Sequence, residues 1–197
     1  MNGNPLLDIS NLLITTLASL YLAAIVLRFL FQLMRADFYN PISQAVVKVT
    51  NPLLMPLRKI IPGAFGIDIA SIVLALLFHI GIIFVLGLIN GVTILNPLYL
   101  LAWSAIGIAN LVVNIFFWGM LIMIIISWVA PQSYNPMIQL LRQLIDPIMA
   151  PFRRLLPPMG GIDLSPILAF LSLQVLMIIV SYAAQQTYLP PQLVLGI

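Results

Sequence analysis

A segment of thirty-one residues occurs twice in this chain, and this duplication constrains the fold more than any other feature. Residues 39–69 and 134–164 align without a gap at a constant offset of 95 residues, and eleven of the thirty-one aligned pairs are identical. The identical pairs include a Tyr-Asn-Pro triplet and a Gly-Ile-Asp triplet at matched places. Each copy lies between two long apolar runs, so we expect one structural unit to be repeated.

The composition places this repeated unit in a membrane. Only 7% of the residues are charged and 62% are hydrophobic, whereas soluble domains carry about 25% charged residues. Cys is absent, which excludes a disulfide, a thiolate metal site and a cysteine nucleophile. We therefore expect an all-α membrane protein whose main solvent is lipid.

Four apolar runs are long enough to cross a hydrocarbon core of roughly 30 Å. We place the spans at about residues 11–34, 70–95, 106–129 and 165–187, with a short interfacial piece at 96–104. The first run has no basic start and no small-residue cleavage site, so we expect it to remain as a span. The chain then divides into a first repeat, residues 1–95, and a second repeat, residues 96–197.

Between the two spans of each repeat, the sequence predicts a short amphipathic helix in the membrane interface. Apolar residues recur there at helical spacing: Ile42, Ala45, Val46 and Val49, matched by Met137, Leu140, Leu141 and Leu144. Asn40 and Asn135 each precede a proline and are expected to cap these helices. Pro52 and Pro147 are expected to end them, because the residue before a proline is pushed out of the α region. The stretch that follows is predicted to be stiff and partly irregular.

The charge distribution orients the repeats. Two spans in each repeat make the repeats parallel, related by an axis along the membrane normal. Basic residues gather in the two loops: Arg35, Lys48, Arg58, Lys59, Arg142, Arg153 and Arg154. By the positive-inside rule, we expect both repeat loops in the cytoplasm and both termini outside.

Two basic pairs, Arg58-Lys59 and Arg153-Arg154, are candidate contacts for anionic lipid head groups or an acidic partner. The alternative interpretation is that they only set the orientation of the chain. Arg28, close to the end of the first span, is expected to extend its side chain toward the head groups. The alternative is an intramembrane cation that pairs with another group of the protein.

Asp68 and Asp163 occupy the same place in the two copies and have two interpretations. Either carboxylate would cap the helix that follows, because it accepts backbone N–H bonds at the positive end of the helix. The alternative is that the two carboxylates pair with the nearby cations or line an ion path.

Among the polar residues of the predicted spans, three are candidate functional residues. We interpret His79 as a hydrogen-bonded side chain, with a haem or proton site as the alternative; the second repeat has Gln174 at the matching position, so no bis-histidine site exists within the chain. Asn110 and Asn114 share one helical face and are expected to bond to a neighbouring helix.

The chain resembles the bacterial YggT family over nearly its whole length. The resemblance rests on the duplicated pattern of Tyr-Asn-Pro, two internal prolines, a Pro-(Leu/Phe)-Arg-(Lys/Arg) motif and Gly-Ile-Asp. The resemblance implies a multi-pass protein of the bacterial cytoplasmic (inner) membrane, with relatives in Gram-positive division clusters and in chloroplasts. It also implies an association with osmotic stress tolerance and potassium-dependent growth. Chloroplast relatives are implicated in haem attachment to cytochrome b6 and in nucleoid organisation. The family brings no catalytic residues, so none is transferred.

The sequence lacks the parts of an enzyme site, such as a carboxylate paired with a base, a nucleophile elbow or a phosphate-cradling glycine loop. We expect a non-enzymatic scaffold or assembly factor that supports envelope integrity and osmotic stress tolerance and uses no cofactor. The alternative is a component of ion transport related to potassium. The expected partners are the bilayer, including anionic lipids, and other membrane proteins, with a homo-oligomer left open and no nucleic acid.

Overall fold

The computed structural model describes residues 5–64, 66–92, 96–130, 133–156, 163–190 and 193–195, and within these ranges the regular secondary structure is helical. Six helices follow along the chain: α1 (Pro5–Leu33), α2 (Pro41–Ile60), α3 (Ile69–Ile89), α4 (Pro97–Val129), α5 (Pro136–Leu155) and α6 (Ser165–Gln186). Four of them, α1, α3, α4 and α6, are long and apolar enough to cross a membrane. The expected all-α class with four candidate spans is confirmed. Residues 157–162 of the second copy, which include the matched Pro157, Gly161 and Ile162, lie outside the described residues.

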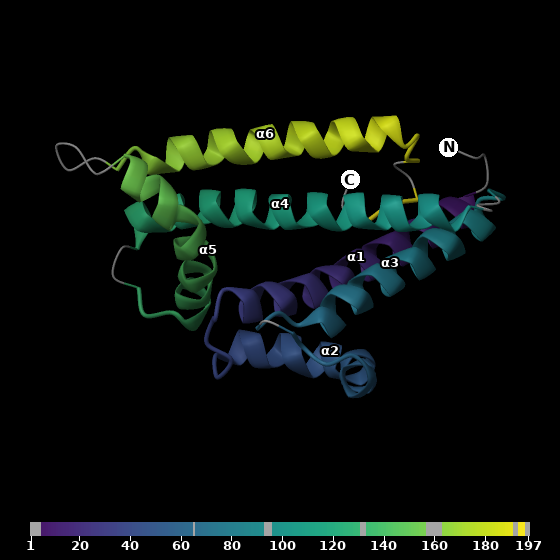
Figure 1. Ribbon diagram of the computed structural model, residues 1–197, viewed down its shortest axis with the longest axis horizontal. Helices are drawn as coiled ribbons and strands as arrows, with labels where there is room; N and C mark the ends of the chain where they lie inside the picture. The colour runs from purple at the N-terminus through teal and green to yellow at the C-terminus, as the bar shows by residue number, and fades with distance from the viewer. Residues whose placement is uncertain are drawn as a thin grey trace.

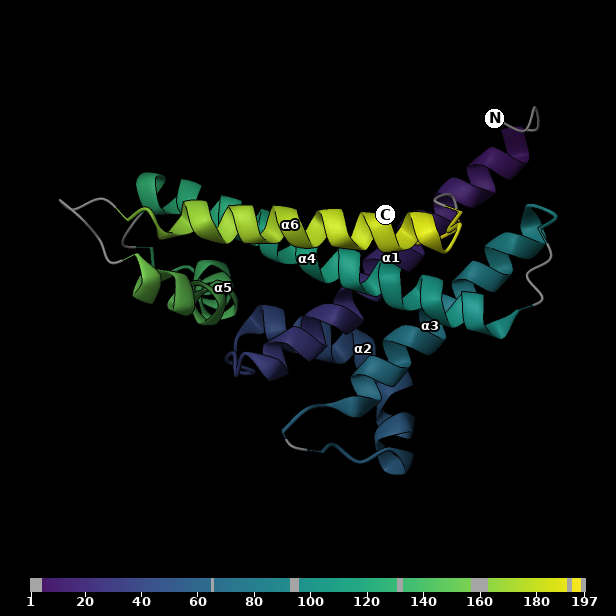
Figure 2. The ribbon, with the colours of Figure 1, turned by 45° about the horizontal axis from the view of Figure 1, so that its top comes forward.

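The six helices form two groups of three that contact each other. α1 packs along α3, α4 packs along α6, and α3 also packs against α4 (Figure 1). In the same way, α2 contacts α1 and α3, and α5 contacts α4 and α6. Because α2 also contacts α5, the two short helices lie toward the same end of the long ones (Figure 2).

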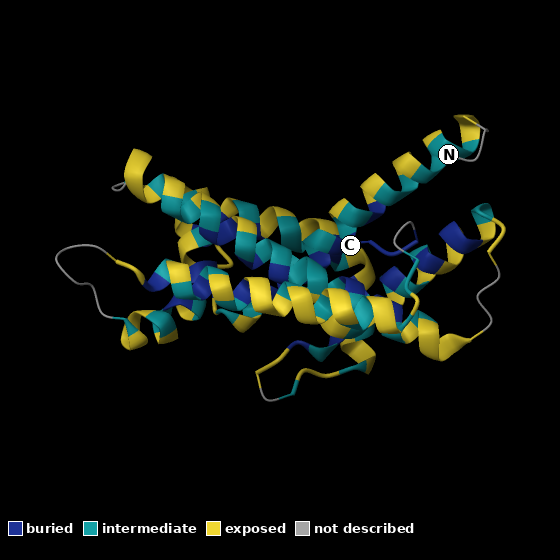
Figure 3. Ribbon diagram, turned by 90° about the horizontal axis from the view of Figure 1, so that it is seen from above, coloured by how far each residue is buried: buried dark blue, intermediate teal, exposed yellow. Residues whose placement is uncertain are grey.

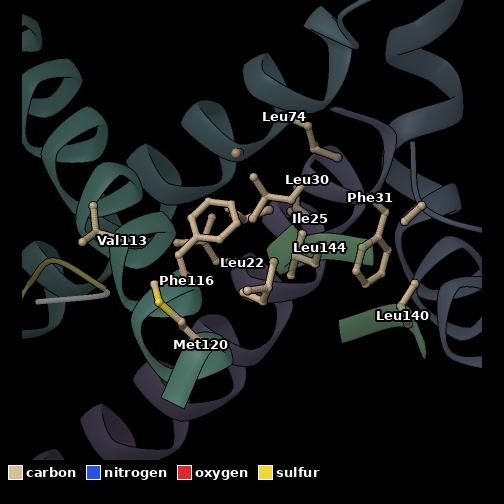
Figure 4. Close-up of a cluster of buried hydrophobic side chains, with 14 of the residues drawn as sticks. Leu22, Ile25, Leu30, Phe31, Leu74, Val113, Phe116, Met120, Leu140 and Leu144 are labelled. Carbon is tan, nitrogen blue, oxygen red and sulfur yellow. The ribbon is translucent and has the colours of Figure 1, made fainter. Parts of the chain in front are cut away.

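One buried apolar cluster joins the two groups. Figure 4 shows Leu22 and Ile25 of α1 close to Phe116 of α4 and Leu144 of α5, and all four are buried. Exposed residues follow the outward faces of the long helices (Figure 3). Since lipid tails are as apolar as these side chains, close packing and buried polar contacts must hold the helices together.

The two short helices run through their internal prolines, so the expectation that they end before Pro52 and Pro147 is wrong. Each helix has 20 residues and contains two internal prolines: Pro52 and Pro56 in α2, Pro147 and Pro151 in α5. A proline removes a backbone hydrogen bond and bends the helix, and Figure 1 shows both helices bent. Leu54 and Met149, just beyond the bends, are buried. Tertiary packing therefore holds each helix together past a residue that disfavours it.

α4 is one continuous helix of 33 residues, so the expected interfacial piece at 96–104 followed by a separate span is wrong. Trp103 and Ser104, which lie where we expected the break, are buried. The Trp103 indole N–H donates to the Thr187 carbonyl (3.0 Å), and the Ser104 hydroxyl donates to the Leu76 carbonyl (3.3 Å). These contacts fix the first turns of α4 against α3 and the end of α6. At 1.5 Å per residue α4 is about 50 Å long, so it must tilt or extend beyond the hydrocarbon core.

Candidate functional site

In the first repeat, an ion pair closes the loop between α2 and α3. Arg58 Nη2 lies 2.5 Å from Asp68 Oδ2, and the Asp68 side chain is only 4% exposed. The same carboxylate accepts hydrogen bonds from the hydroxyl and the backbone N–H of Ser71, in the first turn of α3. Asp68 thus pairs with a cation and caps a helix at the same time.

The protonation of Asp68 reflects these opposing contacts. Burial raises the pKa of the Asp68 carboxyl. Hydrogen bonds from Arg58 and Ser71, together with the charge of Arg58, lower that pKa by more than burial raises it. The net effect is a pKa below the usual value for aspartate. The carboxylate therefore remains ionised, and the ion pair intact, at neutral and mildly acidic pH.

The matching pair in the second repeat is looser and more exposed. Arg153 Nε lies 3.7 Å from Asp163 Oδ2, while Arg153 Nη1 lies 3.1 Å from Asp146 Oδ1. Asp163 also accepts the backbone N–H of Ser165 at 2.9 Å. Hydrogen bonds from Ser165 lower the pKa of Asp163 against a smaller opposing effect of burial, and the charge of Arg153 adds to the lowering. One guanidinium is shared here by two carboxylates.

The first member of each basic pair forms an ion pair within the chain, although its side chain is partly exposed, 36% for Arg58 and 47% for Arg153. Arg58 and Arg153 are held by aspartates of the chain itself. Lys59 and Arg154, the next residues in sequence, are exposed. Lys59 and Arg154 are therefore exposed cations that a lipid head group or an acidic partner can contact.

The two asparagines before the prolines begin α2 and α5. Asn40 Oδ1 accepts the backbone N–H of Ile42 at 3.0 Å, and Asn135 Oδ1 accepts that of Met137 at 2.8 Å. Asn40 makes a second contact, because its Nδ2 donates to the Pro136 carbonyl at 2.7 Å. This amide links the starts of the two short helices across the halves of the molecule.

Arg28 does not extend toward the head groups as we expected. Its side chain is only 4% exposed, and its Nη1 lies 3.0 Å from the Val47 carbonyl, 2.7 Å from Thr50 Oγ1 and 2.8 Å from Asn51 Oδ1. These three acceptors share the two hydrogens of one nitrogen. They lie just before Pro52, where the proline ring disrupts the backbone ladder of α2, so a long cation from α1 satisfies oxygen atoms at the bend.

The second repeat lacks these donors. In the first repeat the Tyr21 hydroxyl also donates to the bend, at 3.4 Å from the Val49 carbonyl. The residues 95 positions after Tyr21 and Arg28 are Phe116 and Met123, and neither side chain carries a hydrogen-bond donor. This difference between otherwise matched copies is the sequence signal that would have identified Arg28 as a partnered residue.

His79 is fully buried in α3 and holds the C-terminal tail. Its Nε2 accepts the backbone N–H of Leu195 at 2.9 Å, so the ring proton lies on Nδ1, which is 3.3 Å from the Ser104 carbonyl. Leu193 and Val194 are buried as well, in a cluster with α3 and α4 side chains. Residues 193–195 therefore pack into the helix bundle, which no local sequence pattern indicated.

Gly107 of α4 allows the tail to approach closely. A Cβ at this position would lie 2.5 Å from His79 Cε1, 2.7 Å from Val194 Cγ1 and 2.8 Å from the Leu195 carbonyl oxygen. Atoms cannot pack at such distances, so any larger residue must displace the tail or the His79 ring.

The amides of the spans make two kinds of contact. Asn114 Nδ2 donates to the Asn110 carbonyl at 2.9 Å, within α4 rather than to the neighbouring helix that we expected. A pair that we did not predict joins α1 to α3, because Asn11 and Asn90 exchange side-chain hydrogen bonds of 2.9 and 3.1 Å. Across the described part of the chain, no group of three or more His, Asp or Glu side chains is placed to hold a metal ion.

The chain matches the family model described as CCB3/YggT twice, over residues 7–89 and 102–184. An uncharacterized protein of Pseudomonas aeruginosa is 48% identical to it, over 92% of this chain and 93% of that protein. The uncharacterized protein YggT of Escherichia coli K12 is 42% identical, over 89% of this chain and 90% of its own. YlmG homolog protein 2, chloroplastic, of Arabidopsis thaliana is 40% identical over 30% of this chain and 24% of its own. No solved structure matches the chain.

Proposed function

The chain belongs to the CCB3/YggT family, and on this premise we propose that it is a non-enzymatic scaffold of the bacterial cytoplasmic membrane. In this proposal α1, α3, α4 and α6 cross the bilayer as two parallel repeats. The short helices α2 and α5 lie at the cytoplasmic surface, where they dock membrane proteins and contact anionic lipids.

The observation that carries the proposal is the matched pair of short amphipathic helices, linked to each other by the bond from Asn40 to the α5 start. Each helix presents an exposed cation in its last turn, Lys59 in α2 and Arg154 in α5. The next residues, Ile60 and Leu155, are apolar but 78% and 71% exposed. Cations beside exposed apolar side chains suit a helix that lies in the membrane interface or a surface that docks a partner.

The proposed orientation places both loops in the cytoplasm and both termini outside, and the gathering of basic residues in the loops supports it. Because the chain contains no Cys, single cysteines introduced at Ile60 and at Leu155 would report their side of the membrane. Both are expected to react with a membrane-impermeant maleimide only in inside-out vesicles. Reaction of the two positions from opposite sides would overturn the parallel arrangement.

Crosslinking in living cells tests the scaffold itself. A photoreactive amino acid at Lys59 or Arg154 is expected to capture the same discrete membrane proteins, because the two helices lie at one end of the molecule. The matched control is Ile178, which is exposed on α6 away from the short helices and is expected to capture mainly lipid. If neither loop position captures a protein that the control position misses, the scaffold proposal fails.

The polar groups within the spans support a scaffold over an ion carrier. Arg28, His79 and Asn90 all form hydrogen bonds to other parts of the chain, whereas a transport path needs polar groups that face a passing ion. Potassium flux through the purified protein in liposomes discriminates the two. Flux above that of protein-free liposomes would favour the transport alternative.

We further propose that the scaffold supports envelope integrity and osmotic stress tolerance in the cell. A strain without the gene is expected to grow poorly in high salt and to be rescued by the wild-type chain. Rescue should weaken when Lys59 and Arg154 are both replaced by Gln, since each cation near an anionic surface contributes about 1 kcal/mol. Normal growth of the deletion strain in high salt would refute this role.

A further inference from the structure

The second repeat contains a cavity of about 650 Å³ bounded by α4, α5 and α6. Six of the lining residues matter for its chemistry: Met123, Ile145, Met149, Arg153, Asp163 and Phe170. The walls are mostly apolar, and Arg153 and Asp163 add a guanidinium and a carboxylate to the lining. Its volume falls within the range of about 300–1,000 Å³ that is usual for small-molecule sites.

In the first repeat, buried side chains occupy most of the matching positions. The residues 95 positions before those six are Arg28, Thr50, Leu54, Arg58, Asp68 and Ala75. All of them except Arg58 are at most 5% exposed, and Arg28 bonds directly to Thr50. The first repeat thus has a buried guanidinium at the position where Met123 borders the cavity in the second.

The charges at the two sites also differ. In the first repeat, two guanidinium groups, from Arg28 and Arg58, lie near one carboxylate, Asp68. In the second, the single guanidinium of Arg153 is shared by Asp146 and Asp163. The second site therefore has a surplus carboxylate and lacks a cation. A bound ammonium would supply that cation through a charge-assisted hydrogen bond.

We propose that this cavity binds one phospholipid whose head group carries a primary ammonium, such as phosphatidylethanolamine. An acyl chain lies along Met123, Ile145 and Phe170, the ammonium donates to Asp163, and the phosphate accepts from Arg153. A head group with only negative charge would meet the Asp163 carboxylate unfavourably. The inference does not depend on the scaffold function, since the cavity and its charges are present whether or not α2 and α5 dock a protein.

Native mass spectrometry of the purified full chain tests the proposal. Protein delipidated in detergent is mixed with phosphatidylethanolamine, phosphatidylcholine or phosphatidylglycerol of identical acyl chains. One phosphatidylethanolamine per chain is expected to bind about tenfold more tightly than phosphatidylcholine, whose quaternary ammonium cannot donate a hydrogen bond. Equal retention of all three lipids would mean ordinary annular contact and would overturn the proposal.

Two variants localise the binding. Asp163→Asn keeps a side chain that caps helices well but removes the charge, and should abolish the preference for phosphatidylethanolamine over phosphatidylcholine. Asp37→Asn removes an exposed carboxylate of the first loop and is the matched control, expected to retain the preference. An undiminished preference in Asp163→Asn would refute the assigned contact.

The triple variant Met123→Arg/Ile145→Thr/Asp146→Asn transplants the first repeat's residues into the second. It is expected to fill the cavity with a guanidinium and to lose the bound lipid while remaining monodisperse in size-exclusion chromatography. Retained lipid in a folded triple variant would place the lipid elsewhere and overturn the proposal. Should this variant aggregate, Asp163→Asn and its control still decide the question.

Discussion

Arg28 Nη1 lies 2.7 Å from Thr50 Oγ1, and both residues are buried between α1 and α2. The contact joins a candidate membrane span to the short helix that follows it, immediately before the first proline bend. The second repeat has Met123 and Ile145 at the same two places, so the duplicated halves differ at the point where each short helix bends.

Arg28→Met is expected to destabilise the protein by about 2 kcal/mol, because the buried oxygens of Thr50 and Asn51 lose a charged donor. The measurement is thermal unfolding of the purified chain in detergent. The paired variant Arg28→Met/Thr50→Ile should recover part of the loss, since it reproduces the apolar pair of the second repeat. Lys48→Met, which removes an exposed cation of α2, is the control and should change stability by less than about 0.5 kcal/mol. An unfolding transition unaltered by Arg28→Met would show that the contact contributes nothing.

The bend of α5 is expected to open more often than the bend of α2. Donors from α1 satisfy oxygens at the α2 bend, whereas Phe116 and Met123 offer none to α5. Hydrogen–deuterium exchange should therefore be faster at residues 144–152 than at residues 49–57. Arg28→Met should bring the exchange of the α2 segment toward that of α5. Equal protection of the two wild-type segments would argue against a role for these donors.

Acidic pH should weaken the ion pair between Arg58 and Asp68, which closes the loop between α2 and α3. The pKa of Asp68 is lowered in the folded chain, so its ionised form contributes stability that is complete above the pKa of the unfolded chain. That contribution is lost as the pH falls below about 4, where unfolded aspartate binds protons, toward the lower folded pKa. Melting temperatures measured from pH 6 to pH 3 should fall less steeply in Asp68→Asn, which starts from a lower stability. The same pH dependence in the variant and the wild type would assign the acid response to other groups.

Gly107→Ala is expected to displace the C-terminal tail, because the added methyl group would overlap His79 and Val194. A single cysteine at Leu195, in a chain that has none of its own, provides the measurement through its rate of maleimide labelling in detergent. The rate should rise at least tenfold when the buried site opens by about 1.4 kcal/mol or more. Gly81→Ala is the matched control, since a Cβ at Gly81 meets no atom within 4 Å. Slow labelling that persists in Gly107→Ala would contradict the close packing of the tail.

Sequence reasoning succeeded where the signal was local or repeated. The four apolar runs identified the long helices, and Asn40 and Asn135 stand at the starts of α2 and α5. It failed where a tertiary contact overrode a local sequence rule. The prolines do not end the short helices, α4 is unbroken, and Arg28 is buried rather than extended to the head groups.

The sequence by itself determined that this chain is a duplicated, helical membrane protein, because hydrophobic length and an ungapped repeat need no knowledge of distant contacts. The tertiary structure alone decided which polar groups meet. Arg28 finds the α2 bend and Leu195 finds His79 only after residues far apart in the chain are packed together. In an apolar surrounding each buried donor must find an acceptor within the protein, and the identity of that acceptor depends on the packing of whole helices rather than on any neighbouring residue.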